Sequence, residues 1–348
     1  MKNPILGIIG GGQLGSMLSD AAKKINIKTV VYSDVEDSPA QNFCDEFILG
    51  KYDDEKKIEE FIIKTDVITY EFENIPFETL KKIESSKKVY PKPEINKIVQ
   101  NRLLEKNFLN DNNILTTDYV HIKSKDDLEK INEITPSILK TCTLGYDGKG
   151  QYKIEKKEDI DKLNLNSSKD YILEKFINLE KEISVILTRY SKNKYEIYEP
   201  FENKHEEQIL KFSKIPAKIN TEIYNKSKDW SINIAETLDY IGTICIEFFI
   251  DNENKLYVNE IAPRVHNSGH MTINTHNISQ FENHVRAVCG LNNIETKKYF
   301  NGEMINLIGK DIIKYRNKKI EKNEFFFDYL KKEIKAKRKM GHFTKVIK

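Results

Sequence analysis

Short apolar runs alternate with segments of helical periodicity through the first ninety residues of the chain. Apolar runs at 4–10, 28–34 and 65–72 are followed by stretches whose apolar positions recur every three or four residues, near 13–25, 55–63 and 77–85. Strands that alternate with helices predict an open, parallel α/β sheet. Tyr90-Pro-Lys-Pro93 then favours an extended segment, because proline disfavours helix in the residue before it. We therefore place the end of the first domain, 1–93, at this segment.

The rest of the chain predicts two further units. Residues 95–114 have the periodicity of a single amphipathic helix. Shorter strand-like runs follow at 136–140, 150–154, 170–177, 182–190 and 243–250, so the middle region, 94–290, is expected to be α+β. After residue 291 the composition becomes lysine-rich, with strand-like runs at 306–309 and 324–330. This part predicts a small C-terminal domain over 291–348.

Composition limits the possible functions. The 56 Lys and Arg residues nearly balance the 54 Asp and Glu residues, so no overall field would steer the protein to nucleic acid or to an anionic membrane. The four cysteines lack C-x-x-C spacing, and we expect them to be reduced and mostly buried. No apolar stretch approaches the roughly 20 residues that span a bilayer. These features predict a cytoplasmic protein that binds neither nucleic acid nor membrane.

A glycine motif follows the first predicted strand. Gly10, Gly12 and Gly15 complete G-x-G-x-x-G, and Asp34 ends the second strand, as in dinucleotide-binding domains. A nicotinamide enzyme is therefore one interpretation. The free N–H groups at the start of a helix bind any phosphate equally well, so the motif indicates phosphate rather than NAD. The other interpretation is a tight turn that binds nothing.

A second glycine-rich loop follows the strand that ends near Lys140. It contains Gly145, Gly148 and Gly150, and it could fold over phosphates while Lys140 neutralises their charge. The loop matches neither the Walker pattern nor the kinase pattern. A flexible surface hairpin is the competing interpretation.

Two strand-like runs around a polar turn at 251–254 predict a hairpin that carries two carboxylates. If the turn has four residues, Ile250 pairs with Lys255. Glu247 then lies opposite Val258, and Glu260 lies two residues further along the same face. Converging carboxylates are costly without a cation, and Mg²⁺ prefers one or two carboxylates together with phosphate oxygens. We therefore predict a magnesium–nucleotide site, with two solvated acids on an edge hairpin as the alternative.

A polar segment follows this hairpin. His266 and His270 have the spacing of the zinc motif H-x-x-x-H, but Asn267 stands where a zinc protease needs glutamate. Zinc hydrolysis is therefore disfavoured. The basic residues at 331–339 are typical of a solvated face, and no nucleic-acid-binding motif accompanies them.

Seven motifs, taken together, resemble one family. GGGQLG, ITYEFENIP, GYDGKGQ, EKFI, NEIAPRVHNSGH, SQFE and RKMGH occur in the order found in the N5-carboxyaminoimidazole ribonucleotide synthetases of the ATP-grasp superfamily. The resemblance covers nearly the whole chain. It implies an ATP-grasp fold with an N-terminal pre-ATP-grasp α/β domain, a small C-terminal domain and a homodimer. It also implies a ligase of purine biosynthesis that joins bicarbonate to 5-aminoimidazole ribonucleotide through carboxyphosphate, with ATP converted to ADP and phosphate.

The same resemblance implies roles for individual residues. Contacts to ATP would come from Arg102, Lys140, Gly145, Tyr146, Asp147, Gly148, Lys149, Gly150, Gln151, Glu174, Lys175, Phe176, Ile177, Glu182, His205, Asn259 and Glu260. The catalytic set near bicarbonate and the amine would be Tyr146, Asp147, Lys149, His266, Asn267 and Ser268. The ribonucleotide would contact Gln13, Leu14, Glu73, Arg264, Lys331 and Arg338, and Mg²⁺ would be held by Glu247 and Glu260. Lys149 stands where the family commonly has arginine, which replaces a bidentate contact by a point charge.

Three other functions are compared with this ligase. An NAD-dependent oxidoreductase is disfavoured because it leaves Glu247, Glu260 and the second glycine loop unexplained. A non-catalytic nucleotide sensor would keep the fold but lack substrate-dependent turnover. A related ATP-grasp enzyme, such as a formate-using transformylase, would act on a different purine intermediate. ATP hydrolysis that requires both aminoimidazole ribonucleotide and bicarbonate would separate the ligase from the oxidoreductase and the sensor. Phosphate release across candidate ribonucleotides, with and without bicarbonate, is the most informative assay.

Overall fold

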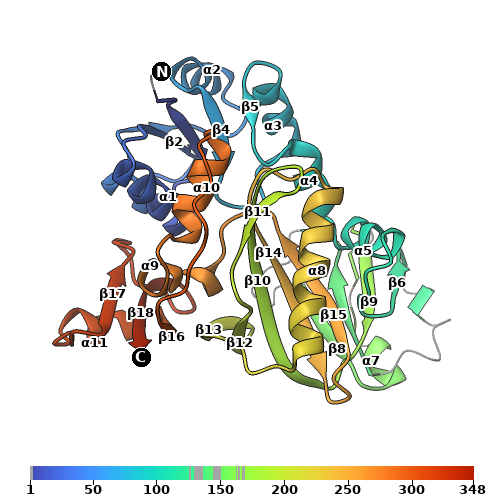
Figure 1. Ribbon diagram of the computed structural model, residues 1–348. Helices are drawn as coiled ribbons and strands as arrows, with labels where there is room; N and C mark the ends of the chain where they lie inside the picture. Colours follow the sequence, from blue (N-terminus) through green and yellow to red (C-terminus); the bar gives the residue numbers. More distant parts are fainter. Residues whose placement is uncertain are drawn as a thin grey trace.

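The computed structural model describes residues 3–124, 127–128, 136–143, 150–161, 163, 165–166 and 169–348. These residues form three β-sheets with helices packed against them (Figure 1). In this part of the chain, no helix combines the length and the apolar character needed to cross a lipid bilayer.

The first sheet is parallel, with strand order β3-β2-β1-β4-β5, which confirms the predicted open α/β sheet. Its elements are β1 (Leu6–Ile9), α1 (Gln13–Lys24), β2 (Thr29–Ser33), the 3-10 helix η1 (Pro39–Asn42), β3 (Glu46–Leu49), α2 (Glu55–Lys64), β4 (Val67–Tyr70), α3 (Phe77–Glu84) and β5 (Lys88–Val89). The central strands β1 and β4 are buried along their whole length, so they stand out as apolar runs. The edge strands β3 and β5 were not predicted, because β3 has a single buried residue and β5 is two residues long.

The middle region contains a four-stranded and a nine-stranded sheet. The smaller sheet has the order β6-β9-β7-β8, from Tyr119–Ile122, Tyr171–Lys175, Ser137–Thr141 and Gln151–Ile154, with α7 (Lys157–Asp161) after β8. The larger sheet begins β15-β14-β10-β12-β13, from Leu256–Ala262, Gly242–Asp251, Leu179–Ser191, Phe201–Glu206 and Ile209–Ile215, and β11 (Lys194–Ile197) pairs with β10. Helix α8 (Thr221–Thr237) lies across β10 and β14 (Figure 1). Its apolar side chains join the core on that face, so the opposite face is free to carry a site.

The helix predicted over 95–114 is divided into two helices. Helix α4 (Pro93–Val99) ends before Asn101, whose side chain accepts the backbone N–H groups of Leu103 and Leu104 at the start of α5 (Arg102–Asp111). The apolar periodicity continues through the break, so the sequence pattern did not reveal it. The asparagine cap offers the backbone an alternative to a continuous helix. It places Arg102 in the first turn of α5.

The C-terminal strands extend the nine-stranded sheet. After β13 the order continues β16-β18-β17, from Asn301–Ile308, Lys339–Ile347 and Glu324–Asp328, with α11 (Asp311–Arg316) between β16 and β17. Between β15 and β16 lie the 3-10 helix η2 (Asn267–Gly269) and the helices α9 (Thr272–Thr275) and α10 (Gln280–Val288). Helix α10 packs against α1, and one apolar cluster joins the first sheet, α10 and Tyr329. This cluster brings the first glycine loop close to the lysine-rich segment.

Candidate active site

The two carboxylates predicted to bind a metal lie opposite each other on the β14–β15 hairpin. Glu247 pairs directly with Glu260, so both side chains leave the same face of the sheet. The predicted register was wrong. Ile250 pairs with Leu256, and Val258 lies opposite Phe248.

Two local features account for this difference. The Asp251 carboxylate accepts the backbone N–H groups of Glu253 and Lys255, which lengthens the turn by one residue. The ladder then shifts again between the Phe248 and Glu247 pairs, which leaves Asn259 as the extra residue of a bulge. A total shift of two residues preserves the face of each side chain, because side chains alternate with a period of two. The predicted convergence of the carboxylates is therefore confirmed.

A cleft of about 450 Å³ surrounds this pair of carboxylates. The predicted site residues that line it are Glu73, Arg102, Gln151, Glu182, His205, Glu247, Asn259, Glu260, Arg264, His266 and Asn267. Sequence reasoning missed four further lining residues, Gln208, Leu210, Phe249 and Lys339. Phe249 could have been found from the hairpin, since it lies two residues beyond Glu247 on the same face. Leu210 in β13, Lys339 in β18 and Gln208 in the turn between β12 and β13 are brought to the cleft only by the sheet topology.

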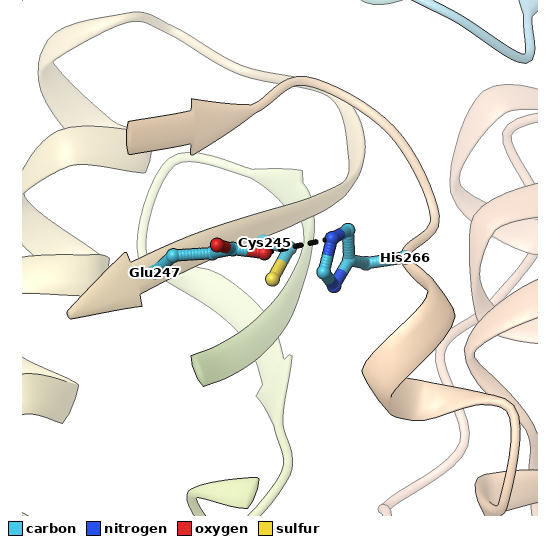
Figure 2. A group of neighbouring side chains, drawn as sticks. All are labelled: Cys245, Glu247 and His266. Carbon is cyan, nitrogen blue, oxygen red and sulfur yellow. Dashed lines mark ion pairs between the residues drawn. The ribbon is translucent and has the colours of Figure 1, made fainter. Parts of the chain in front are cut away.

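Each carboxylate of the hairpin faces a basic side chain. His266 Nε2 lies 2.9 Å from Glu247 Oε1, and Figure 2 shows the two groups pointing toward each other. Arg102 Nη1 lies 3.5 Å from Glu260 Oε2. Burial by itself would raise the pKa of Glu247, but the His266 imidazole lowers it below its ordinary value. Glu247 is therefore held as a carboxylate within the cleft.

Lys140 and Glu174 form a buried ion pair at 2.8 Å. Lys106, which sequence reasoning missed, approaches the same carboxylate to 3.8 Å and donates hydrogen bonds to Thr116 and Thr117. Although burial raises the pKa of Glu174, these lysines lower it to about 2. The carboxylate thus holds Lys140 in place. Lys106 gave no signal, because a lysine within a helical pattern usually faces solvent.

The other predicted nucleotide residues lie around this pair. Lys175, Phe176 and Ile177 connect β9 of the four-stranded sheet with β10 of the nine-stranded sheet, where the side chain of Lys175 is exposed. The backbone N–H of Phe176 donates to the carbonyl of Pro136 at 3.0 Å. Across the cleft, Glu182 and His205 form an ion pair between β10 and β12.

A protein carboxylate fills the first glycine loop, where the sequence predicted a phosphate. The backbone N–H groups of Gly12 and Gly15 both donate to Glu71, the latter at 2.6 Å. A Cβ atom at Gly12 would lie 2.6 Å from the Glu71 carboxylate, so glycine is required for this approach. Glu71 is buried, which raises the pKa of its carboxyl group. The phosphate interpretation assumed that these N–H groups were free, and the loop instead serves an internal anion.

Three distant segments meet beside this loop. Lys331 Nζ donates to Gln13 Oε1 at 2.9 Å, and Gln13 Nε2 donates to Asn267 Oδ1 at 3.4 Å. Arg264 binds Glu73 with two hydrogen bonds, of 2.5 and 3.2 Å. The predicted ribonucleotide residues are thus brought together with the segment that contains His266.

Leu14 and Arg338, two of the predicted ribonucleotide-binding residues, are not among the residues that line the cleft. Leu14 packs into the apolar cluster of α1, so its side chain faces the core. Arg338 donates to the carbonyl of Glu333 and lies 3.9 Å from Asp37, on the loop after β2. Lys332 is exposed, whereas Lys331 reaches Gln13.

The remaining predicted residues are placed as follows. Ser268 is buried in η2, where its hydroxyl contacts His266 Nδ1 at 2.9 Å from behind the cleft. Gly150 accepts the Thr141 N–H and precedes Gln151 in β8. Gly145, Tyr146, Asp147, Gly148 and Lys149 lie outside the described residues.

Three family models match the chain. They are the ribonucleotide synthetase preATP-grasp domain at residues 1–100, the ATP-grasp domain at 107–281 and the phosphoribosylaminoimidazole carboxylase C-terminal domain at 303–348. The N5-carboxyaminoimidazole ribonucleotide synthase of Staphylococcus aureus (strain COL) is 40% identical over 346 residues, which cover 97% of this chain and 91% of the relative. That of Bacillus subtilis (strain 168) is 36% identical over 344 residues, which cover 98% and 90%.

Solved structures agree with these matches. The Staphylococcus aureus N5-carboxyaminoimidazole synthetase complexed with ADP has a TM-score of 0.92 at 37% identity, over 99% of this chain and 93% of that one. The Aspergillus clavatus enzyme in complex with ADP and 5-aminoimidazole ribonucleotide has a TM-score of 0.90 at 26% identity, over 99% and 94%. By sequence and by fold, the chain belongs to the N5-carboxyaminoimidazole ribonucleotide synthase family of ATP-grasp proteins.

Proposed function

We propose that this chain carboxylates 5-aminoimidazole ribonucleotide with bicarbonate and ATP, in the cleft around Glu247 and Glu260. The observation that carries this proposal is that two facing carboxylates share one cleft with three basic residues, Arg102, Arg264 and His266. Membership of the family supports the reaction. The ADP and ribonucleotide complexes of the relatives support a cleft that takes both molecules.

Glu247 and Glu260 are the residues that would hold Mg²⁺. Their carboxylate oxygens are the hard donors that this ion prefers, and Asn259 on the bulge adds an amide oxygen beside them. When bound, Mg²⁺ would neutralise the charge that develops on the transferred phosphoryl group. Each carboxylate also has a basic partner, His266 at 2.9 Å from Glu247 and Arg102 at 3.5 Å from Glu260.

The chain's own residues have distinct tasks in this proposal. Lys140, held by Glu174, and Arg102 would bind the phosphates of ATP. An oxygen of bicarbonate attacks the γ-phosphorus and displaces ADP, which gives carboxyphosphate. His266 and Asn267 line the cleft where this intermediate would form.

The second half of the reaction forms the N–C bond. The exocyclic amine of the ribonucleotide attacks the carboxyl carbon, phosphate departs, and the amine loses one proton to a base or to the departing phosphate. Gln13, Lys331 and Arg264 would bind the ribonucleotide and fix its position in the cleft. A water-poor cleft matters because exposed carboxyphosphate would hydrolyse.

Phosphate release with each substrate omitted in turn tests this function. We expect release to require ATP, aminoimidazole ribonucleotide and bicarbonate together. Release without the ribonucleotide would indicate a simple ATPase, and release supported by formate would indicate a transformylase. Binding of ATP without phosphate release under any of these conditions would indicate a non-catalytic sensor.

Three further features belong to the same proposal. Domain boundaries near residues 93 and 290 are tested by limited proteolysis, which would cut the chain there without releasing the C-terminal part, because β16 pairs with β13 across the second boundary. A homodimer in the cytoplasm follows from the family resemblance, and light scattering coupled to size-exclusion chromatography tests the dimer. Mg²⁺ dependence is tested by titration of the metal at constant ATP.

A further inference from the structure

A thiol, an imidazole and a carboxylate meet at the floor of the cleft. Cys245, Glu247 and His266 each offer one ligand atom, and these atoms all lie within 4.8 Å of one another. Figure 2 shows the Cys245 sulfur beside the facing carboxylate and imidazole. Cys245 and Glu247 are two residues apart on β14 and so share a face, while His266 follows the end of β15.

The three groups differ in their access to solvent. The side chains of Glu247 and His266 are 14% and 11% exposed and line the cleft, whereas Cys245 is fully buried beneath them. A cation that entered from the cleft would therefore meet the carboxylate and imidazole first. The sulfur would then complete its coordination from below.

A chain of buried hydrogen bonds orients the imidazole. Ser268 Oγ contacts His266 Nδ1 at 2.9 Å and accepts from Ser184 Oγ at 2.7 Å. Asn203 donates to Ser184 at 2.9 Å, and Ser213 donates to Asn203 at 2.8 Å. These contacts fix the ring so that Nε2 points to Glu247. Such outer partners are what metal-binding histidines use to hold their orientation.

We propose that Cys245, Glu247 and His266 form a binding site for Zn²⁺ and that its occupancy inhibits the ligase by taking Glu247 from Mg²⁺. Thiolate and imidazole are ligands that favour Zn²⁺, whereas Mg²⁺ favours oxygen alone. Three protein ligands leave the fourth tetrahedral position open toward the cleft. The inhibition rests on the proposed function, but the binding does not.

The protons balance in a simple way. The Cys245 thiol gives its proton to solvent when the sulfur binds the cation. His266 Nε2 faces the Glu247 carboxylate at 2.9 Å, and it gives up the proton of that contact when it binds the cation. The neutral ring then carries its one proton on Nδ1, from which it donates to Ser268 Oγ. The Ser268 hydroxyl is also a hydrogen-bond partner of the Cys245 sulfur, so it can donate to the thiolate.

The competing interpretation is that Cys245 is only a small core residue. Its neighbours in the apolar cluster include Ile186, Ala262, Met271 and Met304. Packing alone, however, predicts no metal chemistry for the sulfur. Spectroscopy can therefore distinguish the two interpretations.

Titration of the full-length protein with Co²⁺, without substrates or Mg²⁺, tests the site directly. We expect one equivalent of Co²⁺ to produce a thiolate-to-metal charge-transfer band that equimolar Zn²⁺ abolishes. Cys245→Ser should lose the band, and Cys289→Ser, at a partly buried cysteine on another element, should keep it. Ser268→Ala should weaken the affinity by about tenfold or more, as loss of an outer partner does. Circular dichroism confirms that each variant is folded.

Two results would overturn the proposal. Absence of the band in the unmodified protein, or its persistence in Cys245→Ser, would exclude Cys245 as a ligand. Turnover is then measured with increasing Zn²⁺, each variant against its own uninhibited rate. Loss of an outer partner costs about tenfold or more in metal affinity, so loss of the sulfur ligand should raise the Zn²⁺ concentration for half-inhibition of Cys245→Ser by at least that factor. Equal inhibition of Cys245→Ser and the unmodified protein would exclude inhibition through this site. A protein that shows the band but has no ligase activity would contradict only the proposed function.

Discussion

The carboxylate of Glu71 accepts the backbone N–H of Gly15 at 2.6 Å, inside the loop that begins α1. Gly12 donates to the same carboxylate. Gln13 lies between these glycines, and its side chain holds Lys331. Glu71 therefore fixes the loop from within and controls the position of Gln13.

Replacement of this carboxylate should impair ribonucleotide binding more than ATP binding. Glu71→Ala leaves two buried N–H groups without acceptors, which costs about 1–3 kcal/mol of unfolding free energy per group. We expect the KM for aminoimidazole ribonucleotide to rise with little change in the KM for ATP. Steady-state kinetics and denaturant unfolding measure both effects. The exposed Glu59→Ala is a matched control, and equal KM values in both variants would contradict a positioning role for Glu71.

Removal of Glu260 should abolish turnover but leave the fold intact. In Glu260→Ala we expect kcat to fall about a hundredfold or more, because charge stabilisation at the transferred phosphoryl group is lost. The exposed Glu253→Ala lies in the turn of the same hairpin and should be unaffected. Phosphate release gives the rate and thermal unfolding checks the fold. Normal turnover in Glu260→Ala would remove the metal assignment.

Alkaline pH should weaken the use of the ribonucleotide. Burial and the neighbouring Arg338 lower the pKa of Lys331 to about 8. The lysine is charged below this pKa and neutral above it, so its attraction for a substrate phosphate is lost as pH rises. We expect kcat/KM for the ribonucleotide to fall between about pH 7 and 9, since this ratio reports groups of the free enzyme.

Two substitutions separate Lys331 from other alkaline effects. Lys331→Arg keeps its charge at these pH values and should remove the fall. Lys332→Ala, at an exposed position, should retain it. A pH profile unchanged by Lys331→Arg would show that another group titrates.

The Lys140–Glu174 pair should be sensitive to the loss of one partner. Lys140→Met removes the cation at 2.8 Å from the buried Glu174 carboxylate and leaves Lys106 at 3.8 Å. We expect a loss of about 3 kcal/mol of unfolding free energy together with a higher KM for ATP. The double variant Lys140→Met/Glu174→Gln should recover much of the stability but not the ATP affinity. Recovery of both would show that Lys140 has only a structural role.

Local sequence patterns were enough to predict the parallel first sheet and the shared face of Glu247 and Glu260. Both follow from local periodicity, because buried central strands are continuously apolar and side chains alternate along every strand. The motif order also identified the family. The sheet and the shared face depend only on residues close together in the sequence. The family follows from short motifs that are specific to it.

Contacts between distant segments determine which group fills each position around the cleft. Glu71, directly after β4, reaches the first glycine loop. Lys331 rather than Lys332 reaches Gln13, and Cys245 lies beneath His266. The residues of these contacts are far apart in sequence, and the packing of α1 on α10 and the continuation of the nine-stranded sheet bring them together. Periodicity specifies which face of an element is buried, but not which partner meets it. That choice depends on the geometry of the whole fold.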